Sequence, residues 1–152
     1  MNPLAPVLQQ EAQALLNTAK QLRPDQAEAA LDCLQRCSEQ GAKLVVTGVG
    51  KSGIVARKIA ATFTSIGLMA IYLNPLDALH GDLGVVGSDD VVFLLSNSGE
   101  SPELLALLPH LHRRGSACIG LTGRPNSSLA KGCQVVLDLS LIHISEPTRL
   151  RS

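Results

Sequence analysis

The sequence predicts an α/β domain built on a doubly wound, five-stranded parallel sheet, in the flavodoxin- or Rossmann-like three-layer class. A chain of 152 residues, 45% of them apolar, is long enough to bury one core. From residue 43 onward, short unbroken apolar runs alternate with segments of helical periodicity. Continuous β-branched runs of this kind are typical of parallel strands that helices cover on both faces.

Two helices are expected before the sheet. Residues 5–22 place Leu and Ala at helical spacing, and Pro24 suits the first turn of a second helix that Gly41 ends. We expect residues 1–41 to pack as N-terminal helices on a sheet domain that spans residues 42–140.

The apolar runs after residue 43 are the expected strands, at 44–46, 70–73, 91–95, 117–121 and 135–137. Helices are expected between them at 52–66, 102–114 and 127–131. Ligands of doubly wound sheets bind at the carboxyl ends of the strands, and the loop motifs of this sequence fall at those ends.

Composition excludes several classes of function. Only 2% of the residues are aromatic, and 13 basic residues balance 13 acidic ones, so we expect no nucleic-acid partner. The sequence shows no secretory signal and no apolar run that could span a bilayer, so we expect no membrane partner. The four cysteines are spaced as free thiols of a cytoplasmic protein; they are Cys33, Cys37, Cys118 and Cys133.

A glycine-rich loop follows the first expected strand. Val45 stands where a nucleotide-triphosphate loop needs its first glycine, which excludes that motif. The dinucleotide pattern is matched by Gly48, Gly50 and Gly53, but no acidic residue ends the second strand. A phosphosugar loop, with Lys51 and Ser52 facing a ligand, is favoured. Dinucleotide binding and a simple tight turn with a solvated Lys51 stay open.

A hydroxyl-rich loop follows the third expected strand. Ser96, Ser98, Gly99 and Ser101 precede a helix with proline in its first turn, which together make an anion cradle. Ser101 is also a good helix N-cap.

Four motifs stand in the order found in sugar isomerase (SIS) domains. They are Gly-Val-Gly-Lys-Ser-Gly at 48–53, His-Gly-Asp-Leu-Gly at 80–84, Ser-Asn-Ser-Gly-Glu-Ser at 96–101 and Leu-Thr-Gly-Arg-Pro at 121–125. The second and fourth resemble those of arabinose-5-phosphate isomerases in particular. This resemblance implies interconversion of ribulose 5-phosphate and arabinose 5-phosphate for Kdo and lipopolysaccharide synthesis. It also implies a homo-oligomer, dimer or tetramer, and no required cofactor.

The resemblance assigns roles to individual residues. Phosphate binding falls on four serines: Ser52, Ser96, Ser98 and Ser101. Moving a proton between adjacent carbons through an enediol needs a base and a group that stabilises the oxyanion. Lys51 and Glu103 match functional positions of the family. An acid in a first helical turn also suits the helix dipole, so a structural role for Glu103 stays open.

His80 is a third candidate catalytic residue. It could act in acid–base chemistry or bind an inhibitory divalent metal, or it could merely hydrogen-bond within its loop. No second His or Cys stands at metal-ligand spacing, which argues against a structural zinc site.

The last residues depart from the family pattern. We expect residues 141–152 to be a non-native or disordered tail, in place of a family segment that supplies further active-site residues. We therefore expect phosphosugar binding with poor turnover. A non-catalytic phosphosugar sensor is the alternative, although residues 1–41 show no basic DNA-recognition helix.

Overall fold

The sheet determines where every other element lies. The computed structural model describes residues 2–139, and in it five strands form one parallel sheet in the order β2-β1-β3-β4-β5. The strands are β1 (Leu44–Gly48), β2 (Ala70–Leu73), β3 (Val91–Ser96), β4 (Ala117–Thr122) and β5 (Val135–Asp138). The predicted five-stranded parallel sheet is confirmed, and the strand order is that of flavodoxin-like folds.

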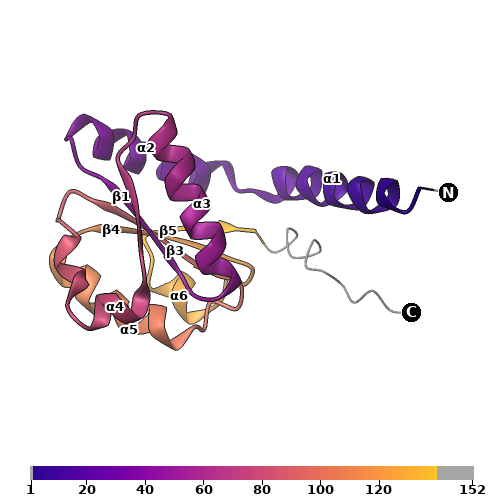
Figure 1. Ribbon diagram of the computed structural model, residues 1–152. Helices are drawn as coiled ribbons and strands as arrows, with labels where there is room; N and C mark the ends of the chain where they lie inside the picture. Colours follow the sequence, from indigo (N-terminus) through magenta and orange to yellow (C-terminus); the bar gives the residue numbers. More distant parts are fainter. Residues whose placement is uncertain (1, 140–152) are drawn as a thin grey trace.

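Helices cover both faces of the sheet (Figure 1). One face carries α2 (Pro24–Glu39) and α3 (Lys51–Ser65), and the other carries α4 (Pro75–Leu79), α5 (Pro102–Arg114) and α6 (Ser128–Lys131). Alternate residues of each strand point to opposite faces, so Leu44 and Val46 join the core under α2 and α3 while Val45 joins the core under α5.

The helix α4 and the short 3₁₀ helix η1 (Asp82–Val85) that follows it were not predicted. The signal for α4 was nevertheless present in the sequence. Asn74 caps the helix, since its Oδ1 accepts a hydrogen bond of 2.9 Å from the amide of Leu76, and Pro75 occupies the first turn.

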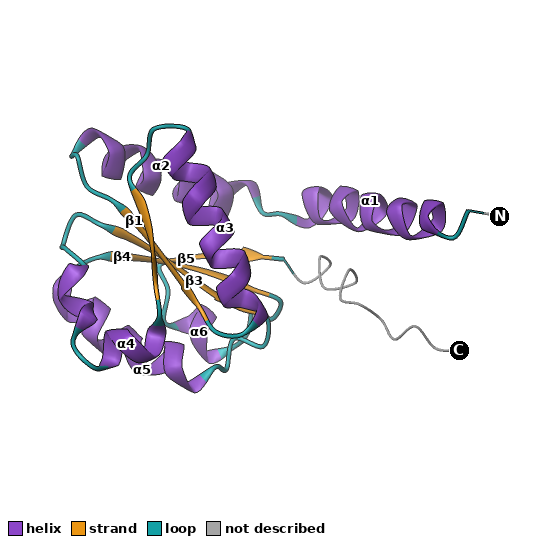
Figure 2. Cartoon of the chain, in the orientation of Figure 1, coloured by secondary structure: helices purple, strands orange, loops and turns teal. Residues whose placement is uncertain are grey.

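The first helix, α1 (Leu4–Gln21), extends away from the sheet and its covering helices (Figure 2). Of its residues, only Ala14 and Thr18 are buried. Leu22 and Arg23 separate it from α2, and their extended backbone sends the two helices in different directions.

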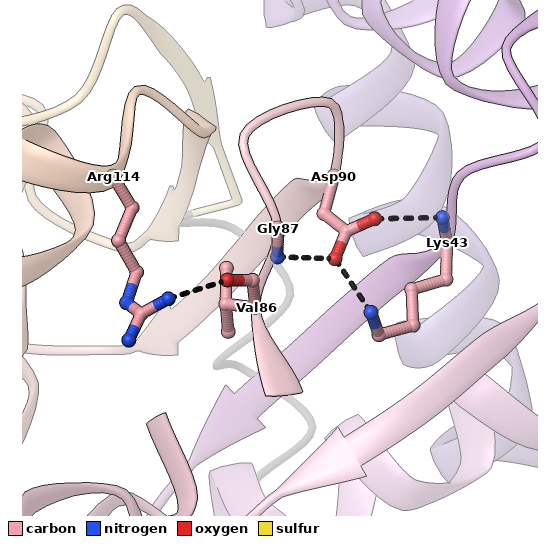
Figure 3. Close-up of polar contacts among 5 residues, drawn as sticks. All are labelled: Lys43, Val86, Gly87, Asp90 and Arg114. Carbon is pink, nitrogen blue, oxygen red and sulfur yellow. Dashed lines mark hydrogen bonds and ion pairs between the residues drawn. The ribbon is translucent and has the colours of Figure 1, made fainter. Parts of the chain in front are cut away.

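A cluster of polar contacts ties the amino ends of the strands together (Figure 3). The carboxylate of Asp90 accepts hydrogen bonds from the amide of Lys43 (2.9 Å), from Lys43 Nζ (2.7 Å) and from the amide of Gly87 (2.7 Å). Arg114, at the end of α5, donates to the carbonyl of Val86 at 3.0 Å. Burial opposes ionisation of Asp90, but these hydrogen bonds outweigh it, and the pKa of Asp90 is lowered.

The outer strand β5 is held from the side by α2. Gln26 Oε1 accepts a hydrogen bond of 2.8 Å from the amide of Val136. The contact joins residues that are 110 positions apart, so it fixes α2 against the edge of the described sheet.

Candidate functional site

The two motif loops meet at the point where the chain changes direction across the sheet. From β1 the chain moves outward to β2, and then returns to the other side of β1 to form β3. Gly48 at the end of β1 pairs in register with Leu95 of β3, one residue before Ser96. This is the topological switch point, where doubly wound proteins bind their ligands. The helices α3 and α5 begin here on opposite faces of the sheet.

The glycine loop makes a tight connection from β1 into α3. Gly50 takes φ +60°, and its carbonyl accepts a hydrogen bond of 3.1 Å from the amide of Gly53. A Cβ atom at Gly53 would lie 2.9 Å from the carbonyl oxygen of Gly48 and 3.2 Å from Tyr72 Oη. Tyr72 donates to that same carbonyl at 3.0 Å. The loop therefore requires glycine for close backbone approach, and β2 holds it in place.

The serine loop is ordered by its own side chains. Ser96 Oγ accepts a hydrogen bond from the amide of Gly99 (3.0 Å) and lies 2.8 Å from Ser101 Oγ. Ser98 Oγ accepts from the amide of Glu100 at 3.0 Å. Ser96 is buried, whereas Ser98 is exposed and Ser101 is half-buried. The loop thus presents two accessible hydroxyls at the start of α5.

Ser101 occupies the N-cap position of α5, as predicted, but its side chain makes no capping hydrogen bond. Its hydroxyl pairs with Ser96 instead. The prediction of the position is confirmed and the predicted capping role is wrong, because the turn at Gly99 brings Ser96 Oγ within hydrogen-bonding distance of the Ser101 hydroxyl.

A third loop, from β4 into α6, closes against the serine loop. Glu100 accepts a hydrogen bond of 3.1 Å from the amide of Ser128. Hydrogen bonding from the side chain and from the amide of Ser128 lowers the pKa of Glu100. Thr122 Oγ1 donates to the carbonyl of Asn97 at 3.3 Å. The backbone of α6 thus holds the Glu100 carboxylate, and the serine loop is tied to both β4 and α6.

The three charged candidates have unpaired polar groups, and two of them begin the helices that leave the motif loops. Lys51 is the first residue of α3 and is exposed, Glu103 is half-buried in the first turn of α5, and His80 is exposed at the end of α4. Within residues 2–139, none of the three forms an ion pair or a side-chain hydrogen bond. An ammonium and a carboxylate are therefore available to a ligand at the starts of α3 and α5, whereas His80 lies at the end of α4 opposite to the connection from β2.

In the part of the chain that the structure describes, no cluster of three or more His, Cys, Asp or Glu side chains could hold a metal ion. Among those residues, His80 thus belongs to no cluster of three or more potential ligands. Nor is any helix of that part both long enough and apolar enough to cross a membrane.

Comparison with known proteins gives the family. Residues 38–146 match the model of the SIS domain. The chain belongs to the SIS domain family. Arabinose 5-phosphate isomerase KpsF of Escherichia coli O6:H1 is 38% identical over 143 residues, which is 94% of this chain and 43% of the relative. Arabinose 5-phosphate isomerase KdsD of Pseudomonas aeruginosa is 48% identical over 99 residues, which is 65% of this chain and 30% of that relative.

A solved structure agrees with these relatives. The E. coli CFT073 protein c3406, determined in complex with A5P, is 40% identical and superposes with a TM-score of 0.75. The match covers 91% of this SIS chain and 75% of the c3406 chain. The chain spans less than half the length of the curated relatives that it matches.

Proposed function

We propose that this chain is the SIS domain of an arabinose 5-phosphate isomerase, which binds a pentose phosphate and interconverts its ketose and aldose forms. The observation that carries the proposal is the convergence, at one switch point, of two loops with accessible hydroxyls and of the unpaired charged side chains of Lys51 and Glu103. The names of the KpsF and KdsD relatives and the A5P in c3406 support the choice of sugar.

In the proposal, the phosphate lies between the starts of α3 and α5. Free amides and the positive ends of both helix dipoles favour an anion there. Ser52, Ser98 and Ser101 donate hydrogen bonds to its oxygens. Ser96 is 3% exposed, so it acts by holding Ser101 and Gly99 in place.

The chemical step moves one proton between neighbouring carbons of the open-chain sugar. Glu103 is the proposed base that takes the proton from one carbon and returns it to the next. The ammonium of Lys51 stabilises the negative charge that develops on the sugar oxygen in the enediolate. His80 is the proposed acid–base group for ring opening and for protonating the oxygen. The substrate and product are isomers, so no redox cofactor is required.

Thermal unfolding of the 152-residue chain tests the binding half of the proposal. A ligand of the folded state raises the midpoint by mass action. We expect arabinose 5-phosphate and ribulose 5-phosphate to raise it more than glucosamine 6-phosphate, and NAD to leave it unchanged. The variant Ser101→Ala should reduce the shift, while Ser38→Ala, at an exposed serine of α2, should retain it. A shift with NAD alone would instead favour the dinucleotide interpretation of the glycine loop.

Conversion of ribulose 5-phosphate tests the chemical half. The proposal includes little turnover by this chain, because residues 141–152 are expected to be a tail in place of the family segment that supplies further active-site groups. These residues lie outside the described part of the chain. In a longer chain of the KpsF type, Glu103→Gln should lower kcat by at least about a hundredfold, the range of general acid–base catalysis. The same variant should still show the rise in unfolding midpoint that sugar phosphates produce. Phosphosugar binding with no turnover in any chain length would favour the sensor alternative. The proposed setting is cytoplasmic Kdo and lipopolysaccharide synthesis.

A further inference from the structure

One acidic residue lies in the middle of the serine loop. Glu100 stands between Gly99 and Ser101, beside hydroxyls that the proposed function assigns to the phosphate. A carboxylate that faced a phosphate there would repel it, because two negative charges at close range raise the energy of the complex. Glu100 instead has a partner in α6, since its Oε2 accepts a hydrogen bond of 3.1 Å from the amide of Ser128. Its carboxylate therefore serves a contact between two loops.

The connection from β4 into α6 contacts the serine loop at further points. The carbonyl of Asn97 accepts hydrogen bonds from the amide of Gly123 (3.0 Å) and from Thr122 Oγ1 (3.3 Å). The carbonyl of Gly99 accepts a hydrogen bond of 3.0 Å from the amide of Leu129. The serine loop is therefore held at both of its ends by donors from one neighbouring segment.

That neighbouring segment, residues 122–129, is called the clamp segment below, and it is ordered by hydrogen bonds of its own. Thr122 Oγ1 accepts from the amide of Arg124 (3.1 Å), whose carbonyl accepts from the amide of Ser127 (3.1 Å). Ser127 Oγ accepts from the amide of Ala130 at 3.3 Å. The side chains of Thr122 and Ser127 are buried, so they can act on a ligand of the site only through the serine loop.

The hydroxyls that are proposed to bind phosphate depend on where the serine loop lies. Ser98 Oγ accepts a hydrogen bond of 3.0 Å from the amide of Glu100, and Ser101 is the next residue of the chain. A movement of Glu100 would therefore move both hydroxyls. A loop that is already ordered also loses less conformational entropy when a ligand binds.

We propose that Glu100 is a positioning residue, which sets the affinity for phosphate through its bond to the clamp segment and without touching the ligand. Thr122 is a second positioning residue, because its hydroxyl holds the carbonyl of Asn97 at the other end of the loop. Both roles rest on the proposed function, which places a phosphate at the serine loop.

Titration with inorganic phosphate and with arabinose 5-phosphate, followed by the NMR shifts of backbone amides, tests the role of Glu100. We expect Glu100→Ala to raise the Kd of both ligands by the same factor, about fivefold, the effect of one lost hydrogen bond. Glu100→Gln retains an oxygen that can accept from Ser128 and should bind both ligands nearly as tightly as the unsubstituted chain. Glu28→Ala, at an exposed glutamate of α2, is the matched control and should leave both Kd values unchanged.

The same titrations test Thr122. Thr122→Val retains the branched side chain and removes the hydroxyl, so it should also raise the Kd of both ligands. Thr122→Ser retains the hydroxyl and should bind more tightly than Thr122→Val. Urea unfolding checks that each variant is folded under the conditions of the titration. A role in stability alone would lower the unfolding midpoint and leave the Kd of the folded protein unchanged.

The outcomes separate this inference from the proposed function. Equal Kd values for Glu100→Ala and the unsubstituted chain would overturn the inference and leave the function intact. A loss of affinity for arabinose 5-phosphate alone would overturn it too, because Glu100 would then contact the sugar. Tighter binding by Glu100→Ala would mean that its charge acts on the ligand. An unsubstituted chain that binds inorganic phosphate without preferring pentose phosphates would contradict the proposed function only, and one that binds neither ligand would overturn both.

Discussion

Tyr72 shows how one side chain outside the glycine motif fixes the motif's shape. Its hydroxyl donates to the carbonyl of Gly48 at 3.0 Å, and the guanidinium carbon of Arg57 lies 4.2 Å from the centre of its ring. The hydrogen bond joins β2 to the loop, and the ring packs against α3. Tyr72 therefore connects the three segments that position Lys51 and Ser52.

Replacing Tyr72 with Phe removes the hydrogen bond and retains the ring. We expect the free energy of unfolding to fall by about 1 kcal/mol, the usual net contribution of such a bond. Urea unfolding measures it, as a lower midpoint with an unchanged slope. The ring of Phe should still stack on Arg57, whereas Tyr72→Ala removes the ring as well and should lower the free energy of unfolding further. Equal stability of Tyr72→Phe and the unsubstituted protein would contradict this role for the hydroxyl.

Gly99 combines a left-handed backbone with a close neighbour. It has φ +68°, and a Cβ atom there would overlap the side chain of Ser127. Gly41 has nearly the same φ, +67°, with open space around it. Gly41→Ala should therefore lower the free energy of unfolding by about 1–2 kcal/mol, because of the left-handed backbone conformation alone.

Gly99→Ala should cost more than Gly41→Ala, since Ser127 must also move. Chemical unfolding of the two variants in parallel gives the difference between their free energies of unfolding. This difference measures the cost of the steric overlap with Ser127. Equal costs would mean that the serine loop and α6 separate easily.

Side-chain partners of the site were harder to predict than the site itself. The residues of the two motif loops follow from glycine, serine and proline at fixed spacing after apolar runs. That Ser101 pairs with Ser96, and that Glu100 bonds to Ser128, depends on the fold of the loop and on how closely α6 approaches from 28 positions away. The sequence of the serine loop alone does not indicate how near α6 lies to it in the fold.

At the scale of elements, the strands and long helices were predicted because each is a continuous run or a regular stripe of apolar residues. The short α4 was missed because five residues show no periodicity, although Asn74 and Pro75 marked its start. The order β2-β1-β3-β4-β5 could not be predicted, since buried strands of similar composition give no information on which neighbour each one takes.

The contacts of Asp90 join elements whose ends would otherwise separate, and they make stability depend on pH. The folded pKa of Asp90 is lowered, so its ionised form stabilises the fold above the usual carboxyl pKa, about 3.9. That contribution is lost as pH falls through the folded value. At pH 7, the thermal unfolding midpoint of Asp90→Asn should thus be several degrees below that of the unsubstituted protein. This difference in midpoint should become smaller below about pH 4.

The neighbouring Asp89 is the matched control for this measurement. Asp89 is exposed, so the unfolding midpoint of Asp89→Asn should be close to that of the unsubstituted protein both at pH 7 and below about pH 4. The midpoints of Asp90→Asn and the unsubstituted protein could instead differ by a constant amount down to about pH 3. The destabilisation would then come from the altered side-chain geometry and not from the lost charge.

At the scale of the whole molecule, the buried thiol of Cys118 and the half-buried thiol of Cys133 report on opening of the core. Burial raises the pKa of Cys118 to about 11, and burial together with the nearby Cys118 raises the pKa of Cys133 to about 12. Thiolates are the reactive form, so both should alkylate slowly at about pH 8 in the folded protein and quickly in denaturant. Mass spectrometry of digests after timed labelling measures both rates.

The same two thiols predict a loss of stability in base. Unfolded thiols ionise near about pH 8.5, while the folded ones retain their protons, so the fold is progressively less favoured as pH rises from there toward about 11. Replacing Cys118 with Ala should flatten that decline. Fast labelling of Cys118 in the folded protein at mildly basic pH would mean that the sheet opens locally.

The direction of α1 is the part of the fold that periodicity could not give. An apolar stripe shows that a helix must be covered, but the same stripe serves for packing on its own sheet or on another copy. In the structure, the extended backbone at Leu22 and Arg23 directs α1 away from the chain's own sheet.

The hydrogen bond from Val136 to Gln26 has a consequence for aggregation. An outer strand with free amides is a template on which a strand of another molecule can add, and so begin a growing sheet. Gln26 occupies one of those amides with a side chain that cannot propagate the pattern. Because α2 lies along the same edge, an incoming strand would have to displace a helix as well as a hydrogen bond. The N-terminal region thereby limits growth of the sheet at β5.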